Sequence, residues 1–185
     1  MRLSGTARRW TVGAGLCILA ALIGYVWMDA TTGAASAEHH EEERPAEVQV
    51  AKQVLHAFNE SDWDTFGDLV TEDHVYVEYG TQRTIEGREA LLEALVAWKA
   101  TMPDVVAKPS AFLVGGKSVA IELTWVGTHT GPLMTPNGEI PASGNVQKTP
   151  GVWIIDVEDG KAVASRNYFD LTTLLQQIGA MPAGE

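Results

Sequence analysis

The sequence predicts an α+β domain in which a curved antiparallel sheet wraps over a long helix. Two short helical patterns open the folded part, the strongest helical pattern spans residues 88–102, and a run of strand patterns separated by turn signals follows. An apolar fraction of 45% in 185 residues is enough for one core. A curved sheet over a helix leaves a cone with one open mouth, where we expect an apolar small-molecule pocket.

The first two helices are predicted between residues 45 and 70. Pro45 opens a pattern whose apolar residues recur at helical spacing, namely Ala51, Val54, Leu55 and Phe58. Ser61 is the expected N-cap of the second helix, whose apolar residues are Trp63, Phe66, Leu69 and Val70.

A short strand and the long helix come next. Residues 74–79 alternate, so that Val75, Val77 and Tyr79 share one face and His74, Tyr76 and Glu78 share the other. A loop containing Gly80 and Gly87 follows. The long helix is expected from Arg88 to Met102, where Pro103 ends it.

The rest of the chain reads as an antiparallel meander. Strands are predicted at 105–114, 119–130, 146–157 and 163–169. Gly115–Gly116 and Asp159–Gly160 are tight-turn dipeptides, and a loop rich in Gly and Pro is expected over 131–144. A terminal helix over 172–178 ends at Gly179.

The first 37 residues have the features of an export leader. Three arginines precede an uncharged stretch from Trp10 to Met28, and Ala35–Ser36–Ala37 provides a cleavage site. The stretch is also long enough to span a bilayer, so a cleaved signal peptide and a retained membrane anchor both stay open. Both place the rest outside the cytoplasm, either periplasmic or extracellular, or anchored in the inner membrane and facing out. We expect a flexible acidic linker over 38–45 and one domain over 46–182.

Charge and cysteine content exclude several classes of function. A formal net charge of -11 repels phosphates, so nucleic acid is not an expected partner. The one cysteine, Cys17, lies inside the leader, which rules out a disulfide framework within the chain. No spacing of His residues indicates a metal site, and no dinucleotide or phosphate-loop motif is present, so we expect no metal and no cofactor.

Several segments, in this order, resemble the SnoaL-like polyketide cyclase and ester cyclase family of the NTF2-like superfamily. The run 127–133 (GTHTGPL) is similar to the family's GTHxGxF segment, 168–170 (YFD) to its YxD strand end, and 174–179 (LLQQIG) to its LLxQLG helix. Phe58–Asn59, Trp63, Asp73 and 85–90 match its opening helices and the entry to its long helix. The resemblance spans about Glu47 to Pro182 and implies an NTF2-like cone, an apolar pocket and a homodimer. The long 131–144 loop and the leader depart from the family pattern.

Asp170 and His129 are the predicted catalytic residues. The resemblance implies that Asp170, at the end of the last strand, is an acid/base residue, and in a dry pocket its pKa would be raised. An aspartate directly before a helix is equally typical of an N-cap, and both roles stay open. His129 shares strand parity with Leu123 and Trp125, so it should face the apolar side as a proton donor or as a core histidine.

Six further residues are candidate ligand-binding residues. Tyr76 could supply a hydrogen-bond donor and Glu78 a second carboxylate. An edge strand that exposes its polar side chains to water is the more common explanation of this pattern. Trp125 could line an apolar pocket. Arg166 and Tyr168 share parity with Asp170, where Arg166 would hold that carboxylate ionised or form a surface ion pair. Asn167 lies on the alternate face and could bond to the backbone.

Two hypotheses of function follow. The first is cofactor-free acid–base chemistry of the cyclase or isomerase type on a small apolar carbonyl compound. The second is a non-catalytic exported module that binds a lipophilic ligand or a protein partner. The sequence alone does not choose between them, because this fold carries many functions.

Overall fold

The computed structural model describes residues 45–135 and 138–182. The predicted leader, with Cys17 and the stretch from Trp10 to Met28, lies outside the described residues, as does nearly all of the predicted linker. Within the described ranges, no helix has both the length and the apolar character needed to cross a membrane.

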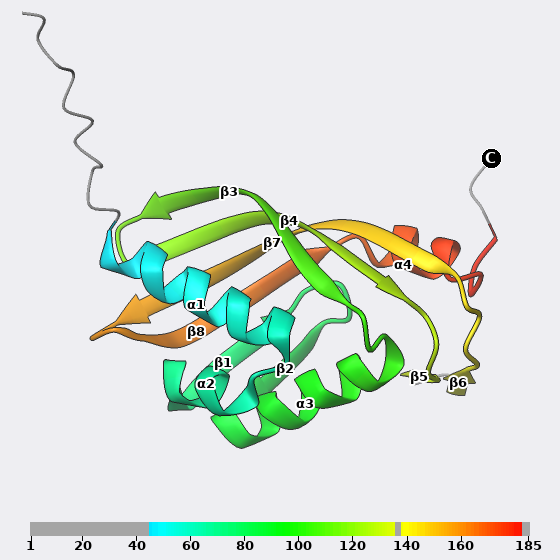
Figure 1. The fold of residues 1–185 in the computed structure, drawn as a ribbon, viewed down its shortest axis with the longest axis horizontal. Helices are drawn as coiled ribbons and strands as arrows, with labels where there is room; N and C mark the ends of the chain where they lie inside the picture. The colour runs from blue at the N-terminus through cyan, green and yellow to red at the C-terminus, as the bar shows by residue number, and fades with distance from the viewer. Residues whose placement is uncertain (1–44, 136–137, 183–185) are drawn as a thin grey trace, which may run out of the picture. The chain divides into compact units, whose positions relative to one another are not determined.

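The described part contains four helices and eight strands. The helices are α1 (Ala46–Glu60), α2 (Trp63–Leu69), α3 (Arg88–Thr101) and α4 (Leu171–Gln177). The strands are β1 (Val70–Glu78), β2 (Arg83–Glu86), β3 (Val106–Gly115), β4 (Ser118–Thr128), β5 (Leu133–Thr135), β6 (Gly138–Ile140), β7 (Val146–Glu158) and β8 (Lys161–Phe169). The α+β class predicted from the sequence is confirmed (Figure 1).

The boundary between the first two helices differs from the prediction. Ser61 does not cap α2, because it is the left-handed C-cap of α1 with a φ of 57°. The N-cap of α2 is Asp62, whose carboxylate accepts a hydrogen bond from the Thr65 amide at 3.1 Å. Val70, predicted in the helix, is the first residue of β1.

Six strands form one curved sheet in the order β2-β1-β8-β7-β4-β3. The strands from β3 to β8 pair antiparallel, as predicted. The expectation of a purely antiparallel sheet is wrong at one junction, because β1 pairs with β8 in parallel. This junction brings the C-terminal ends of β1 and β8 side by side, with Glu78 opposite Asn167.

Three short strands lie where the sequence predicted loops. β2 pairs antiparallel with β1 at one sheet edge, and β5 and β6 form a separate two-stranded sheet within the predicted 131–144 loop. Their few residues lack the alternation of apolar side chains that indicates a strand.

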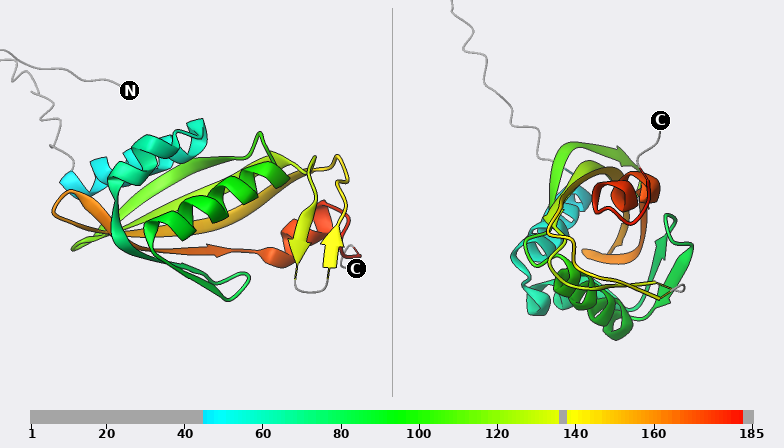
Figure 2. Two further views of the ribbon diagram at one scale, coloured as in Figure 1. Left: turned by 90° about the horizontal axis from the view of Figure 1, so that it is seen from below. Right: turned by 90° about the vertical axis from the view of Figure 1, so that its right-hand side faces the viewer.

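The sheet curves over two helices, as two views show (Figure 2). Helix α1 lies against β3, β4, β7 and β8, and α3 lies against β1 and β2. The core between them is mostly apolar and includes Ala51, Val54, Phe58, Phe66, Leu91, Met102, Ile121 and Ile155, each at most 2% exposed. The predicted cone of a curved sheet around a long helix is therefore confirmed.

Two side-chain amides join helices to the sheet. Asn59 of α1 accepts from the amide of Ala107 at 2.8 Å and donates to its carbonyl at 3.0 Å. Gln177 of α4 does the same to Lys148, accepting at 2.5 Å and donating at 3.1 Å. Each amide therefore takes the place of a neighbouring strand at one residue of β3 or β7.

Candidate functional site

The sheet presents one set of alternate side chains to the interior of the cone. On β1 these are His74, Tyr76 and Glu78, whereas Val75 and Tyr79 are 37% and 49% exposed on the outer face. The surface interpretation of Tyr76 and Glu78 is thus wrong: Tyr76 is 5% exposed and the Glu78 side chain 15%. The inner face of the neighbouring strands carries Asn167, Trp153, Thr149, Gln147, Trp125 and His129, all buried.

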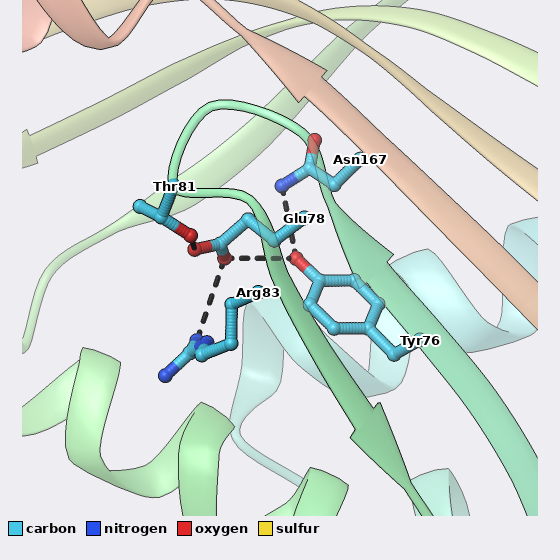
Figure 3. A network of polar contacts seen from close by, with 5 residues as sticks. All are labelled: Tyr76, Glu78, Thr81, Arg83 and Asn167. Carbon is cyan, nitrogen blue, oxygen red and sulfur yellow. Dashed lines mark hydrogen bonds and ion pairs between the residues drawn. The ribbon is translucent and has the colours of Figure 1, made fainter.

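Three of the predicted ligand-binding residues meet in one hydrogen-bonded group. The Tyr76 hydroxyl donates to Glu78 Oε2 at 3.1 Å, and Asn167 Nδ2 donates to the Tyr76 oxygen at 3.2 Å. From the adjacent turn, Thr81 Oγ1 donates to Glu78 Oε1 at 2.5 Å and the Arg83 guanidinium lies 3.5 Å from Oε2. Figure 3 shows the Glu78 carboxylate between Tyr76 on one side and Thr81 and Arg83 on the other.

The directions of these bonds are fixed by chemistry. An ionised carboxylate can only accept, so the single hydroxyl proton of Tyr76 points to Glu78. The amide of Asn167 must then donate to the phenol, which leaves Asn167 Oδ1 buried without a hydrogen-bond partner in the described part. Burial, and then the charge of Glu78, raise the pKa of Tyr76, so that this phenol stays protonated.

His129 lies on the inner face, as its strand parity predicted. Its side chain is fully buried, and Nδ1 accepts a hydrogen bond from the Ser143 amide at 3.3 Å, with the Ser143 hydroxyl 3.1 Å away. Burial lowers the pKa of His129, which favours the neutral ring. A neutral ring that accepts at Nδ1 carries its proton on Nε2, and this N–H has no partner among the described residues.

Four hydrogen-bond donors on the inner face are buried and unpartnered in the described part of the chain. They are His129 Nε2, Gln147 Nε2 and the indole nitrogens of Trp125 and Trp153. Thr149 occupies only the oxygen of Gln147, to which it donates at 2.5 Å. A buried donor left unsatisfied costs roughly 1–3 kcal/mol, so each one calls for an explanation, and a role in binding or catalysis is one. Gln147 was not among the residues predicted from the sequence, although its place on the buried face follows from the alternation of β7.

The two indole donors belong to a cluster of aromatic rings. The Trp125 and Trp153 rings lie 6.0 Å apart, and Phe58 packs edge-on against them at 5.4 and 6.2 Å. Trp125 is 8% exposed and Trp153 is 3% exposed. The inner face thus combines aromatic rings with N–H donors that lack partners in the described part of the chain, and such donors can hydrogen-bond to acceptor oxygens.

Asp170 occupies a different environment from the one expected. It is exposed and is the N-cap of α4, accepting from Thr173 N at 3.0 Å and from Thr173 Oγ1 at 2.6 Å. The expected raised pKa is wrong, because the hydrogen bonds from Thr173 lower the pKa of Asp170. The N-cap role, one of the two that the sequence left open, is confirmed.

Arg166 and Tyr168 lie on the outer face of the sheet. The Arg166 guanidinium binds Asp156 at 2.6 and 2.9 Å, so the surface ion pair is confirmed and Arg166 does not pair with Asp170. Tyr168 stacks on Tyr79 with ring centroids 4.3 Å apart. An open groove on this face includes Glu122, Tyr168 and Asp170 in its lining.

No group of three His, Cys, Asp or Glu side chains within residues 45–135 and 138–182 is placed to hold a metal ion. Asn167, a candidate ligand-binding residue for which a bond to the backbone was the alternative, bonds through its side chain to the Tyr76 hydroxyl.

Comparisons with known proteins identify the family and the fold. A protein from Jannaschia sp. CCS1, proposed to be a SnoaL-like polyketide cyclase, is 18% identical, with a TM-score of 0.66 over 74% of this chain and 94% of that one. IdmH, a proposed polyketide cyclase from Streptomyces antibioticus, is 25% identical, with a TM-score of 0.63 over 72% and 98%. A protein of ketosteroid isomerase-like fold from Catenulispora acidiphila is 19% identical, with a TM-score of 0.60 over 71% and 92%.

No curated protein matches this sequence significantly. The profile of the SnoaL-like polyketide cyclase family matches residues 48–178, which include every inner-face residue described above. The chain therefore belongs to the SnoaL-like polyketide cyclase family.

Proposed function

We propose that this protein binds a small ring compound with carbonyl oxygens inside the cone and catalyses cofactor-free proton transfer beside a carbonyl. The observation that carries the proposal is the set of four buried, unpartnered N–H donors among aromatic walls. Carbonyl oxygens accept hydrogen bonds and aromatic rings pack on tryptophan, so such a compound would satisfy both features.

The chemistry follows from the donors. A hydrogen bond to a carbonyl oxygen acidifies the neighbouring C–H, because negative charge develops on that oxygen when the proton leaves. The unpaired His129 Nε2–H and the indole N–H of Trp153 are both donors that can polarise a carbonyl. The proposed cyclase activity of IdmH supports a reaction of this class. The family resemblance makes Asp170 one candidate for the base.

The test uses the full chain and the bicyclic aromatic ketone β-tetralone. We expect the ketone to quench tryptophan fluorescence on binding, and the protein to speed deuterium incorporation next to its carbonyl in heavy water. Trp153→Phe keeps an aromatic ring and removes one donor, and should weaken binding about tenfold, or about 1.4 kcal/mol. Trp63→Phe is the matched control, because Trp63 packs against Phe58 and Phe66 without an unpartnered indole nitrogen.

The proposed function fails if β-tetralone neither binds nor exchanges faster than in buffer. Equal weakening by Trp153→Phe and Trp63→Phe would also contradict it, because a general loss of packing would then explain both.

A second candidate function is a non-catalytic exported module that pairs through its outer face. The observation in its favour is an exposed patch made by Val75 of β1, Tyr79 directly after β1 and Tyr168 of β8. Export itself is proposed from the leader, and N-terminal sequencing of the mature protein would test it. Sedimentation at high concentration tests self-association. A monomer would contradict pairing of two copies through this patch.

A further inference from the structure

We propose that Glu78 is the base that removes the carbon-bound proton, with Tyr76 and Asn167 as residues that position its carboxylate. This inference rests on the proposed function and names the base of that same site. It assigns the proton transfer to β1, whereas the family resemblance points to Asp170 after β8.

Location separates the two carboxylates. Glu78 is on the inner face, at the end of β1 between Arg83 of β2 and Asn167 of β8. Its side chain is 15% exposed, so it faces the interior and remains reachable from solvent at the β1–β2 turn. Asp170 is exposed and is engaged by the first turn of α4.

The hydrogen bonds of Glu78 hold it in one orientation and leave it able to react. An ionised carboxylate has about four acceptor sites. Thr81 uses one on Oε1, and Tyr76 and Arg83 approach Oε2. Because Asn167 donates to the Tyr76 oxygen, the phenol proton is committed to Glu78 and fixes the carboxylate. The site left on Oε1 can accept a proton from substrate.

Two unpartnered polar atoms of the described chain come from residues paired across the neighbouring strands. Asn167 and Trp153 are opposite one another in the β8–β7 register, and Asn167 Oδ1 and Trp153 Nε1 are both buried without a hydrogen-bond partner. One is an acceptor and the other is a donor. This pair fits a substrate with a carbonyl oxygen toward Trp153 and a hydroxyl or enol toward Asn167, that is, a cyclic hydroxy-ketone.

The step balances without any co-reactant. A Glu78 oxygen takes the proton from the carbon beside the carbonyl, the C–H electron pair forms a C=C bond, and the carbonyl electrons move to the oxygen held by Trp153. The enolate then reacts in one of two ways. In a compound with a C=C bond at the β,γ position, Glu78 returns the proton to the γ carbon and the double bond moves to the α,β position, which isomerises the compound. In a compound with a second carbonyl, the enolate attacks that carbonyl within the same molecule. In the second case a C–C bond forms and the alkoxide takes the proton back from Glu78.

The experiment compares variants of the full chain in deuterium exchange of β-tetralone, with binding measured separately by fluorescence. Glu78→Gln keeps the side-chain shape and an oxygen acceptor but removes the base. We expect its exchange rate at saturating ketone to fall about a hundredfold or more, with binding changed less than about twofold. Glu78→Asp should recover part of the rate. Glu122→Gln, on the outer face, is the matched control and should keep the wild-type rate.

Tyr76→Phe tests the positioning role. It removes the hydroxyl that Glu78 accepts, so we expect a lower rate and a pH–rate profile displaced from that of the wild type. A merely structural role for Tyr76 would lower the melting temperature and leave that profile in place.

The outcomes distinguish this inference from the proposed function. Exchange retained by Glu78→Gln and lost by Asp170→Asn would overturn the role of Glu78 and leave the proposed function standing. A wild-type protein that binds the ketone without exchanging it would overturn the role of Glu78 and the catalytic part of the proposed function together. Absence of both binding and exchange would overturn the proposed function as a whole.

Discussion

At the scale of single residues, Gly131 shows how closely two segments approach one another. A Cβ at this position would lie 2.2 Å from the carbonyl oxygen of Ala100 in α3. The amide of Gly131 also donates to Thr101 at 2.9 Å, which holds the chain after β4 against the end of α3. Any side chain here would push the entry to the 131–144 loop away from the helix.

Gly131→Ala is therefore expected to destabilise the protein by roughly 1–3 kcal/mol, because backbone atoms cannot yield as a flexible side chain can. Urea unfolding measures the change. Gly115→Ala is the control, since a Cβ there meets nothing within 4 Å. Equal stability of the two variants would show that the loop moves freely away from α3.

Also at the residue scale, Asp170 and Glu78 show what the sequence could and could not predict. The pattern of an aspartate before a helix fits both an N-cap and a base, and the two roles differ only in burial, which depends on how α4 leaves the sheet. Alternation placed Tyr76 and Glu78 on one face but did not say which face was inside. His129 was predictable because its strand has a continuous apolar face that defines the inner side.

At the scale of elements, α4 is attached to the sheet mainly beyond the end of β8. In the β7–β8 ladder the last residue of β8, Phe169, pairs with Gly151, so the earlier part of β7 is free on that side. Gln177 fills one position of this free edge by bonding both backbone groups of Lys148. Leu174 and Ile178 of the same segment are buried in the core.

Gln177→Ala should expose the amide of Lys148 and loosen α4, with a loss of about 1 kcal/mol from the two hydrogen bonds. Hydrogen–deuterium exchange at Lys148 is the direct measurement, and we expect it to become faster. Gln176→Ala is the control on the same helix. Unchanged exchange at Lys148 in Gln177→Ala would mean that α4 is held by its apolar contacts alone.

The elements that the sequence predicted well are those with long periodic patterns. Helices α1 and α3 and strand β4 follow apolar repeats, and the turn dipeptides Gly115–Gly116 and Asp159–Gly160 mark the ends of β3, β7 and β8. Strand β2 (Arg83–Glu86) was missed because its four residues are mostly exposed and it depends on pairing with β1. The parallel pairing of β1 with β8 joins segments about ninety residues apart, and no local pattern encodes it.

At the scale of the whole molecule, two buried histidines couple stability to pH. His74 is 1% exposed, with Nδ1 bonded to the Ala162 carbonyl at 3.0 Å and Nε2 to the Ser165 hydroxyl at 2.9 Å. Burial lowers the pKa of His74 and that of His129 below the ordinary value of 6.5. The unfolded chain therefore binds protons at a higher pH than the folded chain does.

We expect the free energy of unfolding to fall as pH decreases below 6.5, by at most about 1.4 kcal/mol per pH unit for each of these histidines. Urea unfolding at a series of pH values measures the slope. His129→Gln should reduce it, whereas His56→Gln serves as the control because His56 is exposed. A slope identical in His129→Gln and wild type would contradict a buried neutral His129.

The bond between Asn59 and Ala107 has a consequence for how copies of this protein meet. β3 is the last strand of its sheet, and an open strand edge is a template on which another chain can add a strand. Asn59 occupies both edge-facing groups of Ala107, and Pro109, two residues on, has no N–H to offer. A register shift between Pro109 and Ala111 then bends the strand. Ala107 and Pro109 therefore offer no free backbone N–H to an added strand, which disfavours aggregation by strand addition along this part of β3.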